Sequence, residues 1–113
     1  MLLEEMIQKI AKALDDRKGH KIRILEVSEV SSVCDAFIIV SGSVSSHIEA
    51  LCDSTEECMR KAGIELRNRE GRADGGWILL DYENVVVHIF TDEMRDFYDL
   101  EHTWRDANIR SFE

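Results

Sequence analysis

The sequence predicts an α/β fold, a single domain in which helices pack on a mixed five-stranded sheet. Helical and strand-like segments alternate along the chain, and some strands are joined by tight turns whereas others are separated by helices. Tight turns join antiparallel strands and helices join parallel ones, so both kinds of pairing are expected. A chain of 113 residues can bury one hydrophobic core but not two. We therefore expect residues 1–113 to form one domain.

The first part of the chain predicts one helix and two strands. Residues 2–18 place apolar side chains every three or four positions, which is typical of an amphipathic helix, and Gly19 is its expected stop. Residues 21–27 alternate imperfectly between apolar and polar side chains, which favours a strand. The apolar run 36–40 is typical of a strand buried on both faces.

A second helix is expected to end at Gly63. Ser46 and Glu49 have the spacing of a capping box, in which the two side chains satisfy free backbone amides at the start of a helix. Glycine is typical of the position just after a helix. Residues 64–69 alternate like a strand with one solvated face, and the glycine-rich residues 70–76 predict a loop.

A β-hairpin with arms at 77–82 and 85–90 is predicted at the centre of the sheet. Both arms are rich in aromatic, β-branched and aliphatic side chains, and the two residues between them form the turn. The second arm is nearly all apolar, as a central strand covered on both faces should be.

The first arm should present one polar and aromatic face. Side chains alternate across a strand, so Trp77, Leu79 and Asp81 should lie together on one side of the sheet. Ile78 and Leu80 should enter the core on the other side.

The end of the chain predicts one more helix. Thr91 is the expected N-cap, with acidic residues in the first turn and the helix continuing from Met94 to Trp104. Residues 105–113 show no convincing period and are interpreted as a tail.

The charge of the protein restricts its partners. The sequence carries 23 acidic against 14 basic residues, a formal net charge of −9. Such a surface repels phosphate backbones, so direct nucleic-acid binding is disfavoured. A basic protein remains a suitable partner, because complementary electrostatic fields steer association.

The cysteines and the N-terminus indicate a cytoplasmic protein. Cys34, Cys52 and Cys58 are an odd set without a CxxC pair, which argues against a disulfide framework and a structural zinc site. The N-terminus carries Glu4 and Glu5 where a signal peptide carries basic residues. No apolar run approaches the length needed to cross a bilayer, so we expect no membrane contact.

Two short patterns leave an enzymatic alternative open. Gly42 and Ser43 lie between a strand and a helix, as in a phosphate-binding turn, but no GxGxxG or P-loop lysine accompanies them. Asp81 and Glu83 have the spacing of paired metal ligands on a strand. The alternative is a small nucleotidyltransferase-like or nucleotide-binding domain. His88, alone in an apolar strand, is interpreted as a structural residue.

Four blocks of the sequence resemble the ribosomal silencing factors, also called the Iojap family. The blocks are Ser31–Ser32 with Asp35 and Phe37; Ser41–Gly42–Ser43; Trp77–Tyr82 with Val85–Phe90; and Arg95 with Phe97, Tyr98, Leu100, Glu101 and Trp104. The resemblance extends from the first helix to about Trp104. Glu83–Asn84 departs from the family, which has a Gly-Asp turn, so Asn84 is expected to supply any positive φ that the turn requires.

The resemblance implies a fold similar to nucleotidyltransferases but without their catalytic carboxylates, and no enzymatic activity or cofactor. It implies binding to the large ribosomal subunit through ribosomal protein fourteen of that subunit, and a block on association with the small subunit that lowers translation under nutrient limitation. It also implies a homodimer when the protein is free. The expected partner-binding residues are Trp77, Leu79, Asp81, Tyr82, Tyr98 and Trp104.

Overall fold

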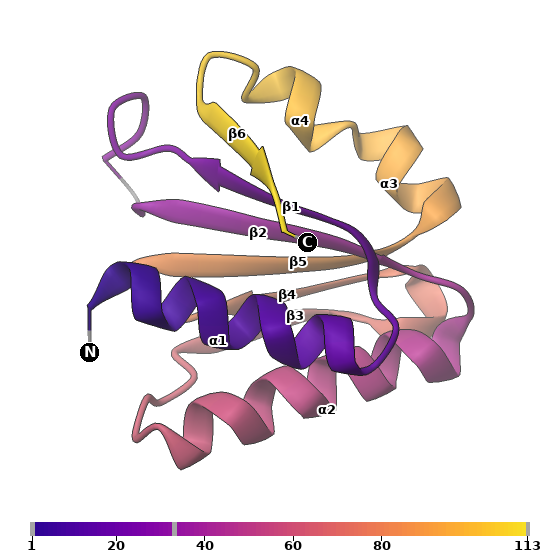
Figure 1. Ribbon diagram of the computed structural model, residues 1–113. Helices are drawn as coiled ribbons and strands as arrows, with labels where there is room; N and C mark the ends of the chain where they lie inside the picture. The colour runs from indigo at the N-terminus through magenta and orange to yellow at the C-terminus, as the bar shows by residue number, and fades with distance from the viewer. Residues whose placement is uncertain (1, 33, 113) are drawn as a thin grey trace.

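The computed structural model describes residues 2–32 and 34–112 and forms three layers (Figure 1). Helices α1 and α2 lie side by side under a twisted sheet, and the short helices α3 and α4 lie on its other face. The elements in chain order are α1 (Leu3–Asp16), β1 (His20–Glu26), β2 (Ala36–Gly42), α2 (Ser45–Lys61), β3 (Asn68–Arg72), a 3₁₀ turn (Ala73–Gly75), β4 (Trp77–Asp81), β5 (Val85–Thr91), α3 (Asp92–Tyr98), α4 (Leu100–Thr103) and β6 (Asn108–Ser111). No helix in the described chain is both long and apolar enough to cross a membrane.

The sheet has the order β3-β4-β5-β2-β1-β6 and is mixed, as predicted. Strands β2 and β5 are parallel, and every other neighbouring pair is antiparallel. The prediction of five strands is wrong, because β6 pairs with β1 in the register Leu25 to Ile109. This strand has only four residues, and its partner lies more than eighty positions earlier in the chain, so local periodicity gave no signal for it.

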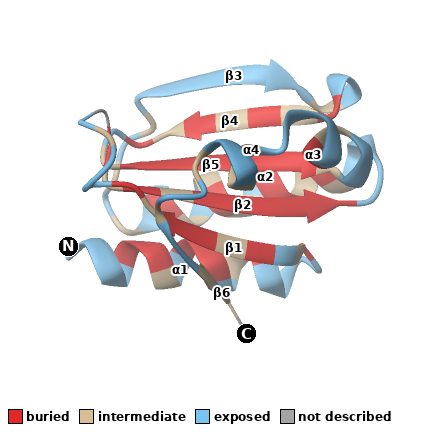
Figure 2. Ribbon diagram, turned by 90° about the horizontal axis from the view of Figure 1, so that it is seen from above, coloured by how far each residue is buried: buried red, intermediate tan, exposed pale blue. Residues whose placement is uncertain are grey.

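Both faces of the sheet are covered, and each has its own hydrophobic cluster. The larger cluster lies between the sheet and the α1–α2 layer, and the smaller one lies under α3 and α4. Figure 2, seen from the α3–α4 side, shows the central strands buried and the edge strand β3 exposed along its length. Strand β5 is buried from Val85 to Phe90, which confirms its predicted central place.

The first two helices end in the same way, in a Schellman motif. In α2, Gly63 has φ +77°, and the Ile64 amide donates to the Met59 carbonyl at 2.9 Å, which confirms the predicted stop. In α1, the residue with positive φ is Lys18, one position before the predicted stop. Gly19 is needed for another reason: a Cβ there would lie 2.6 Å from Cγ2 of Val40.

The predicted capping box at the start of α2 is wrong. The helix begins at Ser45, and no side chain at its N-cap, Val44, caps it. His47 acts instead: its Nδ1 accepts a hydrogen bond from the Ser43 amide at 2.9 Å, and its Nε2 donates to the Arg17 carbonyl at 2.8 Å. The imidazole thereby joins the start of α2 to the end of α1.

The predicted strand at 64–69 and loop at 70–76 are displaced. Residues Ile64 and Leu66 pack against the larger cluster, and strand β3 starts only at Asn68. The alternation in 64–69 therefore reflects a segment that dips toward the core at the edge of the sheet. The glycine at 71, expected in a loop, lies inside β3 with φ +89°.

The last predicted helix is two helices. Thr91 is the N-cap as predicted, since its Oγ1 accepts from the Met94 amide at 3.3 Å. The chain then breaks at Asp99, which has φ +45°. The break brings Glu101 back toward Arg95, and the two side chains make two hydrogen bonds of 3.1 and 3.2 Å. A continuous helix from Met94 to Trp104 is therefore wrong.

Candidate partner-binding face

The side of the sheet under α3 and α4 carries most of the aromatic side chains, and we call it the aromatic face. It is defined by Phe37, Trp77, Leu79, His88 and Phe90 from the strands, and Tyr98 and Trp104 from the α3–α4 segment. Directly paired residues of neighbouring strands point to the same side of a sheet. The pairs Trp77 to Phe90 and Leu79 to His88 therefore place β4 and β5 side chains together on this face.

Trp77 is half-buried and held by three neighbours. Its indole Nε1 donates a hydrogen bond to Nδ1 of His88 at 3.2 Å. The ring stacks on Phe90 with centroids 5.3 Å apart and contacts Tyr98 at 4.5 Å. The side chain is thus fixed in one orientation while part of it stays open to solvent, which is the condition of an anchor residue in an interface.

His88 is the buried partner that fixes the indole. It is 5% exposed, and burial lowers its pKa from 6.5 to about 4. Its Nδ1 accepts from Trp77, so the proton of the neutral ring is on Nε2, which has no hydrogen-bond partner among the described residues. Its ring also packs edge to face against Phe37, a contact consistent with the interpretation of His88 as a structural residue.

Beside Trp77 the face is hollowed by about 240 Å³, and Leu79 forms one wall. Glu70 and Gly71 of β3 form the other side. A Cβ on Gly71 would lie 2.2 Å from the Trp77 carbonyl oxygen, so β3 can approach β4 this closely only with glycine there. The hollow exists because an edge strand runs tight against the strand that presents the tryptophan.

Asp81 ends β4 on the same face, half-buried, as predicted from the alternation. Its Oδ1 accepts a hydrogen bond of 2.7 Å from the Glu83 amide and so stabilises the hairpin turn. In that turn Glu83, and not Asn84 as predicted, has the positive φ of +76°. Asp81 therefore stabilises the hairpin turn while its side chain remains partly exposed.

Tyr82 lies apart from the other predicted residues. It is 4% exposed and belongs to the larger cluster, with Ile78 and Leu80, on the side of the sheet covered by α1 and α2. The alternation of β4 carries this signal, because 78, 80 and 82 have the same parity. Its hydroxyl has no hydrogen-bond partner in the described part of the chain.

The α3–α4 segment completes the aromatic face. Trp104 meets Phe37 edge to face at 5.1 Å, and Tyr98 lies over Trp77. Phe97, which was not among the predicted residues, is 75% exposed and meets Tyr98 edge to face at 5.2 Å. The sequence carried a signal for its exposure, because successive residues of a helix point about 100° apart and a helix that lies on a sheet buries one side.

Arg95 holds this segment on the sheet. The guanidinium is buried, bonds Ser41 Oγ on β2 at 2.9 Å and pairs with the Glu101 carboxylate at 3.1 Å. The bridge links β2, α3 and α4 at one point and fixes where Tyr98 and Trp104 lie.

The residues of the nucleotide-binding alternative are not brought together. Gly42 pairs with Thr91 at one end of β5, and Asp81 pairs with Val86 near the other end. Five residues of strand separate these positions, a distance of about 17 Å. Within residues 2–32 and 34–112, no group of three His, Cys, Asp or Glu side chains is arranged to hold a metal ion.

Comparison with known proteins identifies a family for the whole chain. A family model described as ribosomal silencing factor during starvation matches residues 2–113. Curated proteins named ribosomal silencing factor RsfS from Bacillus subtilis and Halalkalibacterium halodurans are 33% and 32% identical to the chain, over 94% and 92% of it and 91% and 89% of their own length. The chloroplastic protein Iojap of Zea mays is 31% identical over 87% of the chain and 42% of its own length.

Solved structures of other proteins have the same fold as this chain. A crystal structure of a protein from Chromobacterium violaceum superposes with a TM-score of 0.89 and 33% identity, covering 92% of this chain and 87% of that one. A Bacillus halodurans structure superposes with a TM-score of 0.81 and 29% identity, covering 97% of this chain and 98% of that one. The chain is therefore a member of the ribosomal silencing factor family, a family of ribosome-associated translation regulators.

Proposed function

We propose that this protein is a non-enzymatic translational repressor of the cytoplasm, which binds the large ribosomal subunit with its aromatic face and sterically blocks association with the small subunit. The receptor on the large subunit is its ribosomal protein fourteen. By occupying the surface where the two subunits meet, the protein lowers translation under nutrient limitation.

The observation that carries the proposal is the fixed, half-exposed Trp77 beside the hollow next to Leu79. Interfaces concentrate their binding energy in such aromatic anchors, which lose little conformational entropy on binding when they are already fixed. On the same face, Glu70 lies opposite Leu79 and Asp81 ends β4, and Arg72, which lies opposite Trp77, forms an ion pair with Asp74. An apolar anchor with acidic neighbours suits a basic ribosomal protein better than an RNA backbone.

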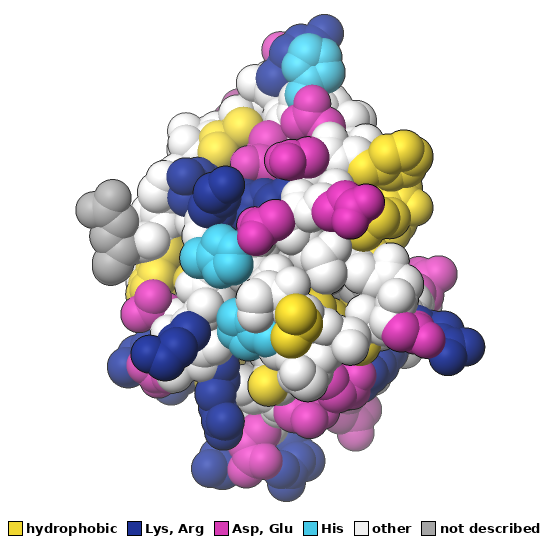
Figure 3. All heavy atoms as spheres, turned by 90° about the vertical axis from the view of Figure 1, so that its right-hand side faces the viewer, with side chains coloured by type: hydrophobic (Ala, Val, Ile, Leu, Met, Phe, Trp, Pro, Cys, Tyr) yellow, Lys and Arg dark blue, Asp and Glu magenta, His cyan; other side chains and the backbone are white. Residues whose placement is uncertain are grey.

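Charge over the rest of the surface supports the same class of partner. Acidic side chains lie between and beside exposed hydrophobic patches on the side of the molecule drawn in Figure 3. With a net charge of −9, long-range attraction favours a basic protein as the first contact.

The proposal is tested by sedimentation of the protein with large subunits. Trp77→Ala should weaken binding by about 2 kcal/mol, roughly thirtyfold. Leu79→Lys, which leaves the indole in place, should weaken it as well. Leu2→Lys is the matched control, because Leu2 is 72% exposed and precedes α1 in the opposite layer. Binding of both site variants at wild-type affinity, with unchanged unfolding temperatures, would refute the assignment of this face.

A subunit-joining assay tests whether binding also blocks ribosome assembly. Large subunits saturated with the protein should fail to form complete ribosomes when small subunits are added, and those mixed with Trp77→Ala should form them. Binding without any effect on subunit joining would leave the protein as a ribosome-bound factor and refute the steric mechanism.

We propose that the free protein is a homodimer. The 75% exposed Phe97 and the partly exposed Tyr98 form an apolar surface that a second copy can cover. Analytical ultracentrifugation of the wild type and of Phe97→Glu tests this, since the variant should sediment as a monomer. A monomeric wild type at micromolar concentration would contradict it.

A further inference from the structure

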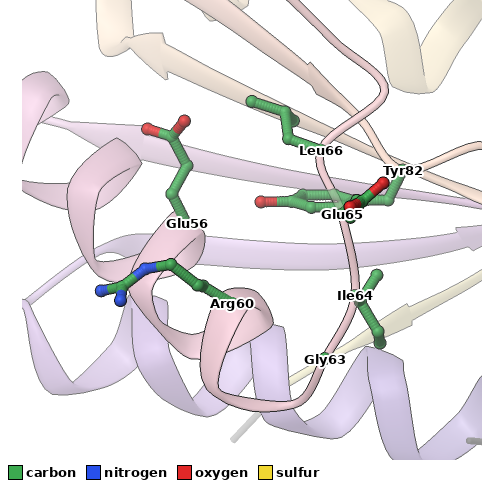
Figure 4. Close-up of a pocket in the computed structure, with 7 residues that line it drawn as sticks. All are labelled: Glu56, Arg60, Gly63, Ile64, Glu65, Leu66 and Tyr82. Atoms are coloured by element: carbon green, nitrogen blue, oxygen red, sulfur yellow. The ribbon is translucent and has the colours of Figure 1, made fainter.

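A second hollow, on the side of the sheet away from the aromatic face, lies between the end of α2 and the segment that leads to β3. Its volume is about 670 Å³. Figure 4 shows Glu56 and Arg60 on the α2 side, Ile64 and Leu66 on the other side, and the ring of Tyr82 between them. The hydroxyl of Tyr82, the residue just after β4, points toward the gap between the two walls.

This hydroxyl is the unusual feature of the hollow. It is buried and has no hydrogen-bond partner in the described chain. A buried polar group without a partner costs about 1–3 kcal/mol, and phenylalanine would fill the same space without that cost. A ligand that reaches the hydroxyl would therefore gain a hydrogen bond that the protein alone does not make.

The charges that line the hollow select the ligand. Glu56 accepts bonds from Arg69 and Cys52 through Oε2, while its Oε1 accepts none from a described residue. Glu65 makes no ion pair within the described chain. The one guanidinium on the wall, Arg60, extends away from the hydroxyl in Figure 4 and pairs with Glu57 at 3.1 Å.

An anion is therefore disfavoured in this hollow and a cation is favoured. Burial is the main cause that raises the pKa of the Tyr82 hydroxyl, and the negative charge of the nearby Glu56 is the second. A phenol oxygen and two carboxylates are acceptors for an ammonium group, whereas Ile64, Leu66 and the tyrosine ring offer apolar contact to methylene groups.

We propose that this hollow is a binding site for an alkylammonium group, whose N–H groups bond the Tyr82 hydroxyl, Glu56 and Glu65 while its carbon chain packs on Ile64 and Leu66. Such a group occurs at the end of a polyamine and at the end of a lysine side chain. The site is independent of the aromatic face, because it lies on the other side of the sheet.

In this proposal the Glu56 side chain, on the wall of the hollow, turns aside to give the ligand access to the buried hydroxyl. Arg69 holds this carboxylate at 3.1 Å but also bonds Glu49 at 2.8 Å, so it keeps one ionic partner when Glu56 moves. A bound ammonium group compensates the movement by pairing with the displaced carboxylate.

Binding is tested by NMR titration of the full chain with n-butylamine, and with n-butanol as the uncharged analogue. Butylamine should shift the amide signals of residues 63–66 and of Tyr82, and butanol should bind at least tenfold more weakly. Tyr82→Phe and Glu65→Gln should each weaken butylamine binding about tenfold, as expected for one hydrogen bond to a charged group. Asp53→Asn, at an exposed position on the same helix outside the hollow, should bind like the wild type.

A stability measurement keeps the test decisive. Tyr82→Phe should unfold at the same temperature as the wild type or higher, because the lost hydroxyl has no partner. Equal binding of butylamine and butanol, or full binding by a folded Tyr82→Phe variant, would overturn the proposal.

The source of the ammonium group is distinguished by two further ligands. Putrescine carries a free diamine, and Nα-acetyl-lysine methylamide carries a lysine side chain with its backbone. Tighter binding of putrescine assigns the site to polyamines, and equal or tighter binding of the lysine derivative assigns it to the side chain of a basic protein. Binding of neither would overturn the site.

Discussion

The indole of Trp77 is fixed before any partner arrives. One hydrogen bond to His88 and two aromatic contacts, to Phe90 and Tyr98, define its orientation. The bond from Trp77 requires His88 to be neutral with its proton on Nε2, because only an unprotonated Nδ1 can accept. The partner-binding residue is therefore coupled to a buried titratable group.

The coupling predicts a pH dependence of stability. The pKa of His88 is about 4 in the folded protein and 6.5 in its ordinary state, so between these values the unfolded chain binds a proton that the folded chain does not. The contribution of His88 to the free energy of unfolding should be nearly constant above pH 7 and should fall as the pH drops from 6.5 to 4. This histidine alone should cost about 2 kcal/mol between pH 7 and pH 5.

Urea unfolding at pH 7 and pH 5 measures this loss. His88→Gln is the comparison, because its amide oxygen can accept the Trp77 hydrogen bond and does not titrate. The variant should lose about 2 kcal/mol less than the wild type over the same interval. Identical pH dependence in the two proteins would show that His88 is not the group responsible.

At the scale of the elements, the hollow beside Trp77 depends on the close approach of β3. Gly71 has φ +89°, and a Cβ there would lie 2.2 Å from the Trp77 carbonyl oxygen. Gly71→Ala should lower the free energy of unfolding by about 2 kcal/mol or more, because both backbone strain and the clash oppose it. It should also weaken the proposed binding to large subunits, since the edge strand must move.

Gly75→Ala is the matched control for this prediction. Gly75 lies four residues later in the 3₁₀ turn, and a Cβ there would meet nothing within 4 Å. Its substitution should change the free energy of unfolding by no more than about 0.5 kcal/mol. Urea unfolding of both variants decides the matter, and equal effects would contradict the close-approach argument.

Removing either partner of the Arg95–Glu101 ion pair, which holds α3 and α4, should lower the free energy of unfolding by a different amount. Arg95 is 7% exposed, whereas the Glu101 side chain is 31% exposed. Glu101→Leu leaves a buried guanidinium whose remaining partner among the described residues is Ser41, and it should cost about 3 kcal/mol. Arg95→Met leaves a carboxylate that water can reach and should cost less.

A double-mutant cycle tests this asymmetry. Arg95→Met combined with Glu101→Leu should be more stable than Glu101→Leu alone, because the double variant contains no unpaired buried charge. If Glu101→Leu is the milder of the two single changes by urea unfolding, the buried charge does not dominate the bridge.

The sequence predicted those elements whose signals are local. The buried run of β5, the alternation of Trp77, Leu79 and Asp81, the Gly63 stop and the Thr91 cap all follow from residues a few positions apart. Comparison with family members added the identity that periodicity cannot supply.

The features that the sequence did not predict depend on distant contacts. Strand β6 exists because β1 offers an unpaired edge, and the break at Asp99 accompanies the closure of Glu101 onto Arg95. His47 replaces the expected capping box because the end of α1 provides a carbonyl for its second nitrogen. Tyr82 is the exception, since continuing the alternation of β4 by one residue would have placed it in the core.

At the scale of the whole molecule, the net charge of −9 should govern how fast the protein meets its receptor. Attraction to a basic partner is screened by salt, so the association rate with large subunits should fall on the order of tenfold between 0.05 and 0.5 M salt, while the dissociation rate changes less. Stopped-flow or surface-binding measurements give both rates.

Salt dependence alone does not separate a basic protein from RNA, because contacts of the 14 basic residues with phosphates would also weaken with salt. Neutralising acids near the anchor separates the two. Glu70→Gln and Asp81→Asn each remove one negative charge, and the asparagine can still accept the bond from the Glu83 amide that holds the turn. If the receptor is a basic protein, both variants should associate more slowly at low salt and equal the wild type at high salt. If the aromatic face meets RNA, the same changes should accelerate association, and the assignment of a basic protein receptor would be wrong.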